Sequence, residues 1–247
     1  MVGIGPGGPL DRTRRAEQAI AASGVIVGYA RYLELIADLT ANKKLISSGM
    51  RQETERCRRA LEAARYGETV ALISSGDSGI YGMAGLALEL NVAEDFSVPI
   101  EIVPGLTAGG AAAARLGAPL MLDYATISLS DLLVPWETIR QRLEAVAAAD
   151  LVTVLYNPKS KKRVKQLDEA IAIFARHRPG TTPVGIGTAV GTVEEQIILT
   201  DLDHVLSQEI GMRSLLIIGN RSSKKLENWF VTPRGYNVQG ERLKDKG

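Results

Sequence analysis

The sequence predicts an α/β protein built from two α/β domains of similar size. Two observations carry this prediction. Apolar segments of strand length alternate with helical segments along the 247 residues, and the alternation is interrupted once, near the middle of the chain. Such alternation is typical of a largely parallel sheet covered by helices. Apolar residues make up 45% of the chain, which is enough material for buried cores.

Six segments are expected to form buried strands because they are apolar throughout rather than at alternate positions. They are residues 25–27, 69–73, 100–103, 151–156, 183–186 and 215–218. Six segments favour helices: residues 12–22, 51–66, 83–90, 108–116, 136–149 and 163–176. Residues 192–202 are more typical of an antiparallel edge strand, so we expect the second sheet to be mixed.

A domain boundary is expected at residues 116–120, where Gly117 and Pro119 interrupt an alanine-rich helical segment. The N-terminal α/β domain would then span residues 1–116 and carry the glycine-rich loops. The C-terminal α/β domain would span residues 120–247 and carry the mixed sheet.

Composition excludes several classes of function. A formal charge of +1 and an aromatic content of 5% argue against a nucleic-acid partner. No apolar segment approaches the ~18 residues expected of a membrane span, so we expect a cytoplasmic protein without a membrane partner. Cys57 is the only cysteine and is expected to be a packing residue. His177 and His204 are expected to be structural. No Cys/His cluster is present, so no protein-bound metal is predicted.

The first glycine-rich segment is Gly3-Ile4-Gly5-Pro6-Gly7-Gly8. It matches the dinucleotide fingerprint, which would imply an oxidoreductase. Pro6 argues against that interpretation because it lacks an amide donor for a phosphate, and the next helix is expected only near residues 11–13. A plain structural turn therefore remains an equally good interpretation of this segment alone.

Two further segments follow predicted strands, where open α/β sheets bind ligands. Residues 74–82 contain three glycines, and Asp77 could accept hydrogen bonds from a ribose or an amino group; an Asx-type turn is the alternative. Residues 103–108 read Val-Pro-Gly-Leu-Thr-Ala, in which Thr107 is suited to cap the following helix.

Taken together, these three segments resemble the tetrapyrrole (corrin/porphyrin) methylase family. In the second half, residues 116–120 (LGAPL), 127–133 (ISLSDLL), 155–158 (LYNP), 219–220 and 232–236 (TPRGY) resemble its precorrin-3B C17-methyltransferase branch. The resemblance implies two α/β domains with S-adenosylmethionine (SAM) in the cleft between them, and a homodimer. Two positions depart from the branch pattern: Leu122 stands where a histidine is usual, and residues 187–191 lack the usual arginine and asparagine.

The resemblance also implies which residues bind the cofactor. They are Pro6, Gly7, Gly76, Asp77, Ser78, Ile80, Thr107, Ala108, Tyr156, Asn157, Gly185 and Leu215. The implied reaction is SAM-dependent C17-methylation of precorrin-3B with ring contraction, in cobalamin biosynthesis. Cobalt-precorrin-3 or another corrin ring is the alternative substrate. Contraction requires proton transfer, for which Asp77, Asp123 and Tyr124 are candidates of equal standing.

A basic cluster follows Asn157-Pro158. It comprises Lys159, Lys161, Lys162, Arg163 and Lys165. A solvated charged face is one interpretation. The other is that Lys159, Lys161 and Lys162 attract the substrate, because a precorrin carries many carboxylates.

Overall fold

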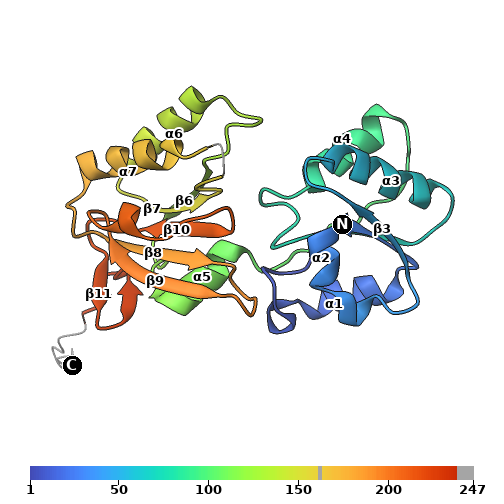
Figure 1. The fold of residues 1–247 in the computed structure, drawn as a ribbon, viewed down its shortest axis with the longest axis horizontal. Coiled ribbons are helices and arrows are strands. Elements are labelled where there is room, and N and C mark those ends of the chain that lie inside the picture. The colour runs from blue at the N-terminus through green and yellow to red at the C-terminus, as the bar shows by residue number, and fades with distance from the viewer. Residues whose placement is uncertain (161–162, 238–247) are drawn as a thin grey trace, which may run out of the picture. The chain divides into compact units, whose positions relative to one another are not determined.

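The computed structural model describes residues 1–160 and 163–237. Contacts divide the chain into two compact units. The first comprises Met1–Ala111 and Ala189–Gln196, and the second comprises Ala112–Thr188 and the residues from Ile197 onward. The segment 189–196 thus belongs to the first unit although it lies deep in the second half of the sequence. Each unit is described separately (Figure 1).

The first unit alternates strands and helices from its first residues. Its strands are β1 (Val2–Gly3), β2 (Val25–Tyr29), β3 (Lys44–Ser48) and β4 (Val70–Ser74), and its helices are α1 (Arg14–Ala22), α2 (Ala30–Glu34), α3 (Glu53–Arg65), α4 (Ala84–Ala93) and the start of α5 (Ala108–Leu116). Two 3-10 turns, η1 (Pro9–Asp11) and η2 (Ala37–Leu39), complete it. The strands form a sheet in the order β1-β4-β2-β3, and neighbouring strands are parallel.

Both faces of this sheet are covered, which explains why its central strands are apolar throughout. On one face, Ile26 and Ile73 pack with Ile20 of α1. On the other face, Val27 and Leu72 pack with residues of α3 and α4. Cys57 belongs to this second cluster and is fully buried, which confirms its prediction as a packing residue. Burial raises the pKa of the Cys57 thiol to about 11.

The second unit contains a five-stranded sheet of order β6-β7-β10-β8-β9. Its strands are β6 (Tyr124–Ser128), β7 (Val152–Tyr156), β8 (Pro183–Thr188), β9 (Gln196–Asp201) and β10 (Ser214–Ile218). The strand β10 is antiparallel to β7 and β8, whereas β6 is parallel to β7. The predicted mixed sheet and the edge position of the strand within residues 192–202 are therefore both confirmed.

One face of this sheet carries the main core of the unit. The helices α6 (Trp136–Ala148) and α7 (Lys165–His177) lie side by side over it (Figure 1). Leu155, Ile186 and Leu216 point to this face and pack with Leu143 and Phe174. A 3-10 turn, η3 (Val205–Ser207), follows β9, and a small sheet joins β11 (Lys224–Leu226), β12 (Trp229–Val231) and β5 (Gly117–Ala118).

The six predicted helices are all present, with ends that differ by up to three residues. The strand predicted at residues 100–103 is wrong, because only Val103 takes part, in an isolated bridge to Val2. No strand was predicted where β1, β3, β5, β6, β11 and β12 lie. In β3 and β6 most side chains are exposed or half-buried, so these strands lack the continuous apolar pattern. In the described part of the chain, no helix is both long and apolar enough to span a bilayer.

Arg178 is a buried cation that ties three segments of the second unit together. Its guanidinium donates to the carbonyls of Gly219 and Leu151, lies 3.5 Å from Asp150 and stacks 4.7 Å from the Phe174 ring centroid. Its side chain is fully buried. Burial lowers the pKa of Arg178 to about 10, and the Asp150 carboxylate acts in the opposite direction.

We expect Arg178→Met to destabilise the second unit by about 3 kcal/mol. The substitution removes the guanidinium that donates to the carbonyls of Gly219 and Leu151 and lies beside the Asp150 carboxylate. Arg140→Met is the control, since Arg140 forms an exposed pair with Glu137 on α6 and should contribute less than about 0.5 kcal/mol. Both tryptophans lie in the second unit, so tryptophan fluorescence in a urea series reports its unfolding. Equal shifts for the two variants would contradict the assigned role.

Candidate functional site

The carboxyl edge of the first sheet carries three loops that contact one another. We call residues 4–8 the first loop, residues 75–82 the second loop and residues 104–107 the third loop. The first follows β1 and the second follows β4, and because these strands are parallel neighbours, both loops emerge at the same edge. Gly5 and Gly76 exchange two backbone hydrogen bonds, of 3.1 and 2.7 Å, which join the first two loops.

The third loop lies on the other side of β1. The amide of Gly3 donates to the carbonyl of Val103 at 2.9 Å. A Cβ atom on Gly3 would lie 2.8 Å from both the Gly105 nitrogen and the Gly76 oxygen. A Cβ atom on Gly105 would lie 2.7 Å from the Gly3 carbonyl carbon and closer still to the Gly76 oxygen. The backbones of Gly3 at the end of β1, Gly76 of the second loop and Gly105 of the third loop are therefore in direct contact. We call this contact the glycine junction.

At position 76 the backbone conformation, and not lack of room for a Cβ atom, favours glycine. Its φ of +64° lies in the left-handed region, and an added Cβ would find no atom closer than 3.9 Å. The nearest atoms to that position are the Ala108 nitrogen and the Leu106 oxygen, at 3.9 Å. Room for a single methyl group therefore remains between the second loop and the start of α5, beside the predicted residue Ala108. Thr107 caps this helix through a 3.0 Å bond from the Gly110 amide, as predicted.

The other predicted residues of the second loop divide into buried and exposed ones. Ser78 is fully buried, and its hydroxyl lies 3.5 Å from the Val103 carbonyl oxygen. Ile80 and Tyr81 are exposed, as is Leu106 of the third loop. Exposed apolar side chains beside a glycine-rich backbone give this edge both apolar contact surface and backbone hydrogen-bonding groups, which is typical of a small-molecule site.

Asp77 uses its carboxylate on the protein itself. One oxygen accepts from the Gly79 amide at 2.8 Å, and the other accepts from the Gly105 amide at 2.9 Å. The first bond forms the Asx-type turn that was considered for this segment. The second reaches across 28 residues to the third loop. The Asp77 side chain does not cap α4, whose N-cap is Met83.

The segment 189–196 contacts the first loop, which the sequence analysis missed. A Cβ on Gly7 would lie 2.5 Å from Thr192 Cγ2, and a Cβ on Gly8 would lie 2.5 Å from the Gly191 oxygen. Within the segment, the Glu195 carboxylate accepts from the Gly191 amide at 2.6 Å. The first loop, with Pro6 and Gly7, is therefore held on two sides. In the sequence, Gly191 is the signal that could have indicated this contact, since a Cβ there would lie 3.2 Å from the Gly8 nitrogen and from Pro6 Cγ.

Four predicted residues lie in the second unit, and three of them share one face of its sheet. Leu216 pairs with Leu155 and points to the core, so the adjacent Leu215 and Tyr156 point to the opposite face. Gly185 points to that face as well, where a Cβ would lie 2.9 Å from the Leu116 Cδ2 atom. Packing of Leu116 thus accounts for the absence of a side chain at 185.

Asn157, the fourth residue, follows β7 in the left-handed region, with φ of +51°. Its amide donates to the Ser128 hydroxyl at 2.9 Å, which links the carboxyl ends of β6 and β7. Arg163 strengthens this link by donating to the carbonyls of Leu129 and Asn157, at 2.9 and 2.6 Å. Burial lowers the pKa of Arg163, and the Asp131 carboxylate acts in the opposite direction.

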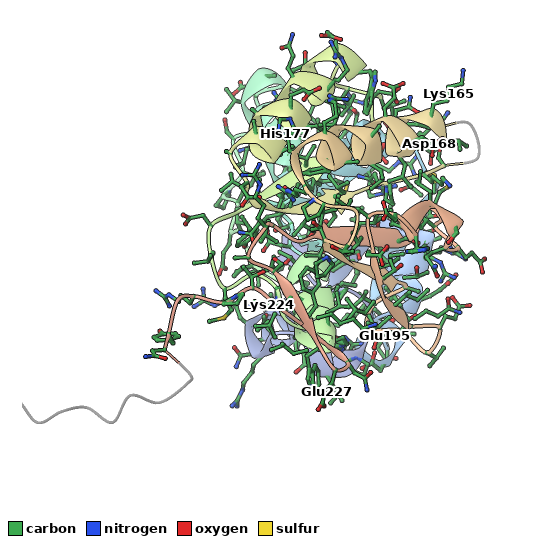
Figure 2. All side chains as sticks on the ribbon, turned by 90° about the vertical axis from the view of Figure 1, so that its left-hand side faces the viewer. Lys165, Asp168, His177, Glu195, Lys224 and Glu227 are labelled. Atoms are coloured by element: carbon green, nitrogen blue, oxygen red, sulfur yellow. The ribbon has the colours of Figure 1, made fainter. Side chains whose placement is uncertain are left out.

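The basic cluster is therefore not uniform. Arg163 is turned inward, whereas Lys165 stands at the start of α7, three residues before Asp168 (Figure 2). Lys159 is half-buried beside Pro158. Lys161 and Lys162 lie outside the described residues. The prediction that the lysines attract the substrate stays a prediction.

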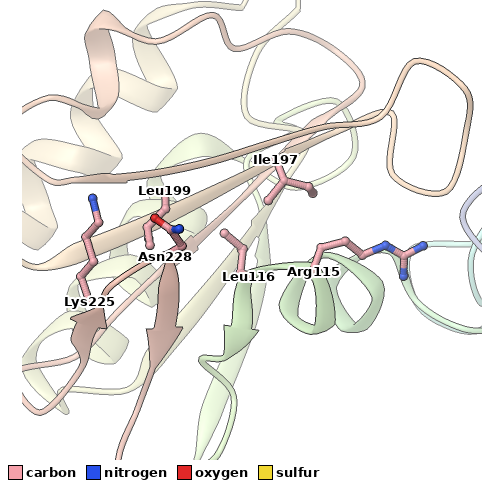
Figure 3. Close-up of a pocket in the computed structure, with 6 residues that line it drawn as sticks. All are labelled: Arg115, Leu116, Ile197, Leu199, Lys225 and Asn228. Carbon is pink, nitrogen blue, oxygen red and sulfur yellow. The ribbon is translucent and has the colours of Figure 1, made fainter.

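The proposed acid/base candidates Asp123 and Tyr124 do not lie near Asn157. Tyr124 begins β6 and pairs with Val152, whereas Ser128 at the other end pairs with Tyr156. Four residue steps separate the two ends, or about 13 Å along the strand. The second unit also has a hollow of about 290 Å³, lined by Leu116, Ile197, Leu199, Arg115, Lys225 and Asn228 (Figure 3). Among the residues that the structure describes, no three His, Cys, Asp or Glu side chains are grouped to hold a metal.

Comparisons with known proteins agree on one family. Residues 1–206 match the family described as Tetrapyrrole (Corrin/Porphyrin) Methylases. The chain is 44% identical over 238 residues to the "Probable cobalt-factor III C(17)-methyltransferase" of Salmonella typhimurium, covering 96% of this chain and 99% of that protein.

Two further matches extend the comparison. The chain is 44% identical to the "Cobalt-factor III methyltransferase" of Priestia megaterium over 240 residues, which is 96% of this chain but only 44% of that longer protein. A crystal structure described as "the methyltransferase CobJ" superposes with a TM-score of 0.88 at 34% identity, covering 94% of this chain and 98% of that one.

We expect Gly105→Ala to destabilise the first unit by about 1–3 kcal/mol, because its methyl group would overlap the backbone of the glycine junction. Gly85→Ala is the matched control. It lies in α4 with open space around its Cβ position, so it should stabilise the helix by about 0.5–1 kcal/mol. Pulse labelling of Cys57, the only thiol, across a urea series measures unfolding of this unit. Equal stability of Gly105→Ala and the parent would show that the loops do not meet at this residue.

Proposed function

Because the chain belongs to the tetrapyrrole (corrin/porphyrin) methylase family, we propose that it transfers a methyl group from SAM to a ring carbon of a corrin precursor. The observation that carries this proposal is the meeting of three glycine-bearing loops at the carboxyl edge of a parallel sheet. No nucleophile is needed, since the methyl group of SAM is already activated on a sulfonium. The protein has to bind, align and exclude water.

The residues at this edge fit the chemistry of SAM. Its adenine ring is flat and largely apolar, and the exposed side chains of Ile80 and Leu106 offer apolar contact. Its methionine part is a zwitterion, which backbone amides and carbonyls can bind. The Ala108 nitrogen and the Leu106 oxygen are such groups, and they lie 3.9 Å from the Cβ position of Gly76, at the positively polarised start of α5. A dinucleotide is a poorer fit, because Pro6 offers no amide to a phosphate.

In this proposal the predicted cofactor-binding residues of the first unit act in different ways. Pro6, Gly7 and Gly76 shape the backbone, Ile80 supplies contact, and Ser78 and Thr107 hold the loops. The remaining predicted residues, Tyr156, Asn157, Gly185 and Leu215, belong to the second unit, and their part in cofactor binding stays a prediction. Alignment of donor and acceptor accelerates the transfer by removing the entropy of bringing them together.

We propose C17 as the methylated position. The supporting features are the segments 127–133, 155–158 and 232–236, which resemble the C17 branch, together with the relative of Salmonella typhimurium named for C17. The branch resemblance favours precorrin-3B, whereas the names of the two 44% identical relatives favour cobalt-factor III. Both are polycarboxylate macrocycles, and the methylation is proposed to be coupled to ring contraction. A homodimer and a cytoplasmic location complete the proposal.

The reaction is tested directly by incubating the protein and SAM, ¹³C-labelled in its methyl group, with precorrin-3B or cobalt-factor III. We expect one label per macrocycle, at C17, detected by mass spectrometry and carbon NMR, together with a contracted ring. A label at another ring carbon would make this protein a different corrin methylase. Incorporation into neither macrocycle would remove C17-methylation of these two substrates as the function.

We expect charge reversal of Lys161 and Lys162 to glutamate to weaken macrocycle binding about tenfold or more and to lower its dependence on salt. Affinity for S-adenosylhomocysteine (SAH) should remain unchanged. The matched control reverses the adjacent lysines Lys224 and Lys225 of β11, which are also exposed. Isothermal calorimetry measures both ligands. If only the control weakened macrocycle binding, the carboxylates would be bound by the hollow of Figure 3 instead.

A further inference from the structure

We propose that Asp77 is a positioning residue: its carboxylate holds the third loop against the second and so keeps the SAM site open in its binding shape. This inference rests on the proposed function. It assigns Asp77 neither a direct cofactor contact nor a proton-transfer role. The geometry points to it because each carboxylate oxygen already accepts a backbone amide, from Gly79 and from Gly105.

The bond to Gly105 has few substitutes. The third loop meets the rest of the edge at the glycine junction, where backbone atoms touch without side chains. The hydrogen bonds that Val103 accepts there, from the Gly3 amide and the Ser78 hydroxyl, precede the loop itself. Among the described residues, Asp77 is the side chain that accepts a hydrogen bond from the Gly105 amide. The third loop also accepts a bond at 3.4 Å from the Thr13 hydroxyl, at the Pro104 carbonyl oxygen, but this bond leads to the start of α1 and not to the second loop. Without the Asp77 bond, Gly105 would depend on van der Waals contact to stay beside Gly76.

A carboxylate is suited to this task and an amide is not. Two N–H donors point at Asp77 from two directions, and a carboxylate accepts from both. Asparagine offers one accepting oxygen, so its NH₂ group would face one of the two N–H donors. The bond to Gly79 is local, two residues along the chain, and should survive in the variant. The bond to Gly105 spans 28 residues and should be lost.

The position of the third loop determines the room beside Gly76. The two atoms nearest the Gly76 Cβ position belong to Leu106, in the third loop, and to Ala108, which follows that loop. Movement of Gly105 away from Asp77 would therefore change the room beside Gly76 and the placement of the exposed Leu106 side chain. The expected consequence is weaker binding of SAM, with the methyl transfer step itself intact once SAM is bound.

The test compares Asp77→Asn with Asp95→Asn in the full chain. Asp95 is a matched control in the same unit: it is exposed, follows α4 and accepts a local bond from the Ser97 hydroxyl. In Asp77→Asn we expect exchange of the Gly105 amide, followed by NMR, to accelerate at least tenfold, and the Kd of SAH to rise about tenfold. The KM for SAM should rise in parallel, while kcat at saturating SAM and its pH profile stay as in the parent. Asp95→Asn should change none of these quantities.

Three outcomes would overturn the proposal. Loss of SAH affinity with unchanged Gly105 exchange would make Asp77 a direct cofactor contact. A fall in kcat of about a hundredfold or more with loss of one limb of the pH profile would make it a general acid or base. Accelerated exchange throughout β1 and β4, with a lower Tm, would make its role that of general stability. If the parent protein itself failed to bind SAH, the proposed function would fail, whereas the Gly105 exchange result would still test the bond.

Discussion

The backbone contact among Gly3, Gly76 and Gly105 is the constraint on which the first unit's candidate site depends. The end of β1 and the loops that follow β4 and the bridge at Val103 can approach this closely only because no Cβ atom lies between them. The hydrogen bonds between Gly5 and Gly76 fix the first two segments in register. Ligand-binding groups of the three loops are thereby placed together before any ligand arrives, which is the condition for binding without a large ordering cost.

In the second unit, side-chain hydrogen bonds and not contacts between glycines hold the strand ends together. Parallel β6 and β7 end side by side, and Asn157, in the left-handed conformation, turns the chain so that its amide reaches Ser128. Arg163 then holds the carbonyls at both strand ends. Arg163, which belongs to the basic cluster of the sequence, is therefore a structural residue that binds backbone carbonyls. The basic cluster of the sequence thus combines a half-buried arginine with lysines whose role only a binding experiment decides.

Asp77 shows how tertiary contacts add to what the sequence suggests for a residue. Its position between two glycines after a strand predicted a ligand site, and the structure places it at the centre of the three loops. Its two oxygens nevertheless accept from the protein backbone. The partner Gly105 lies in another loop, and no local pattern in the sequence indicates that pairing.

The sequence by itself determined the α/β class, the helices and the three glycine-bearing segments, because these depend on local periodicity and on residues with special backbone freedom. It also carried the family, through motifs distributed along the chain. Only the tertiary structure decided that residues 100–103 form a bridge rather than a strand, that β3 and β6 are strands despite their exposed side chains, and that segment 189–196 joins the first unit. These features depend on hydrogen bonds and contacts between segments far apart in the chain, which local periodicity does not encode.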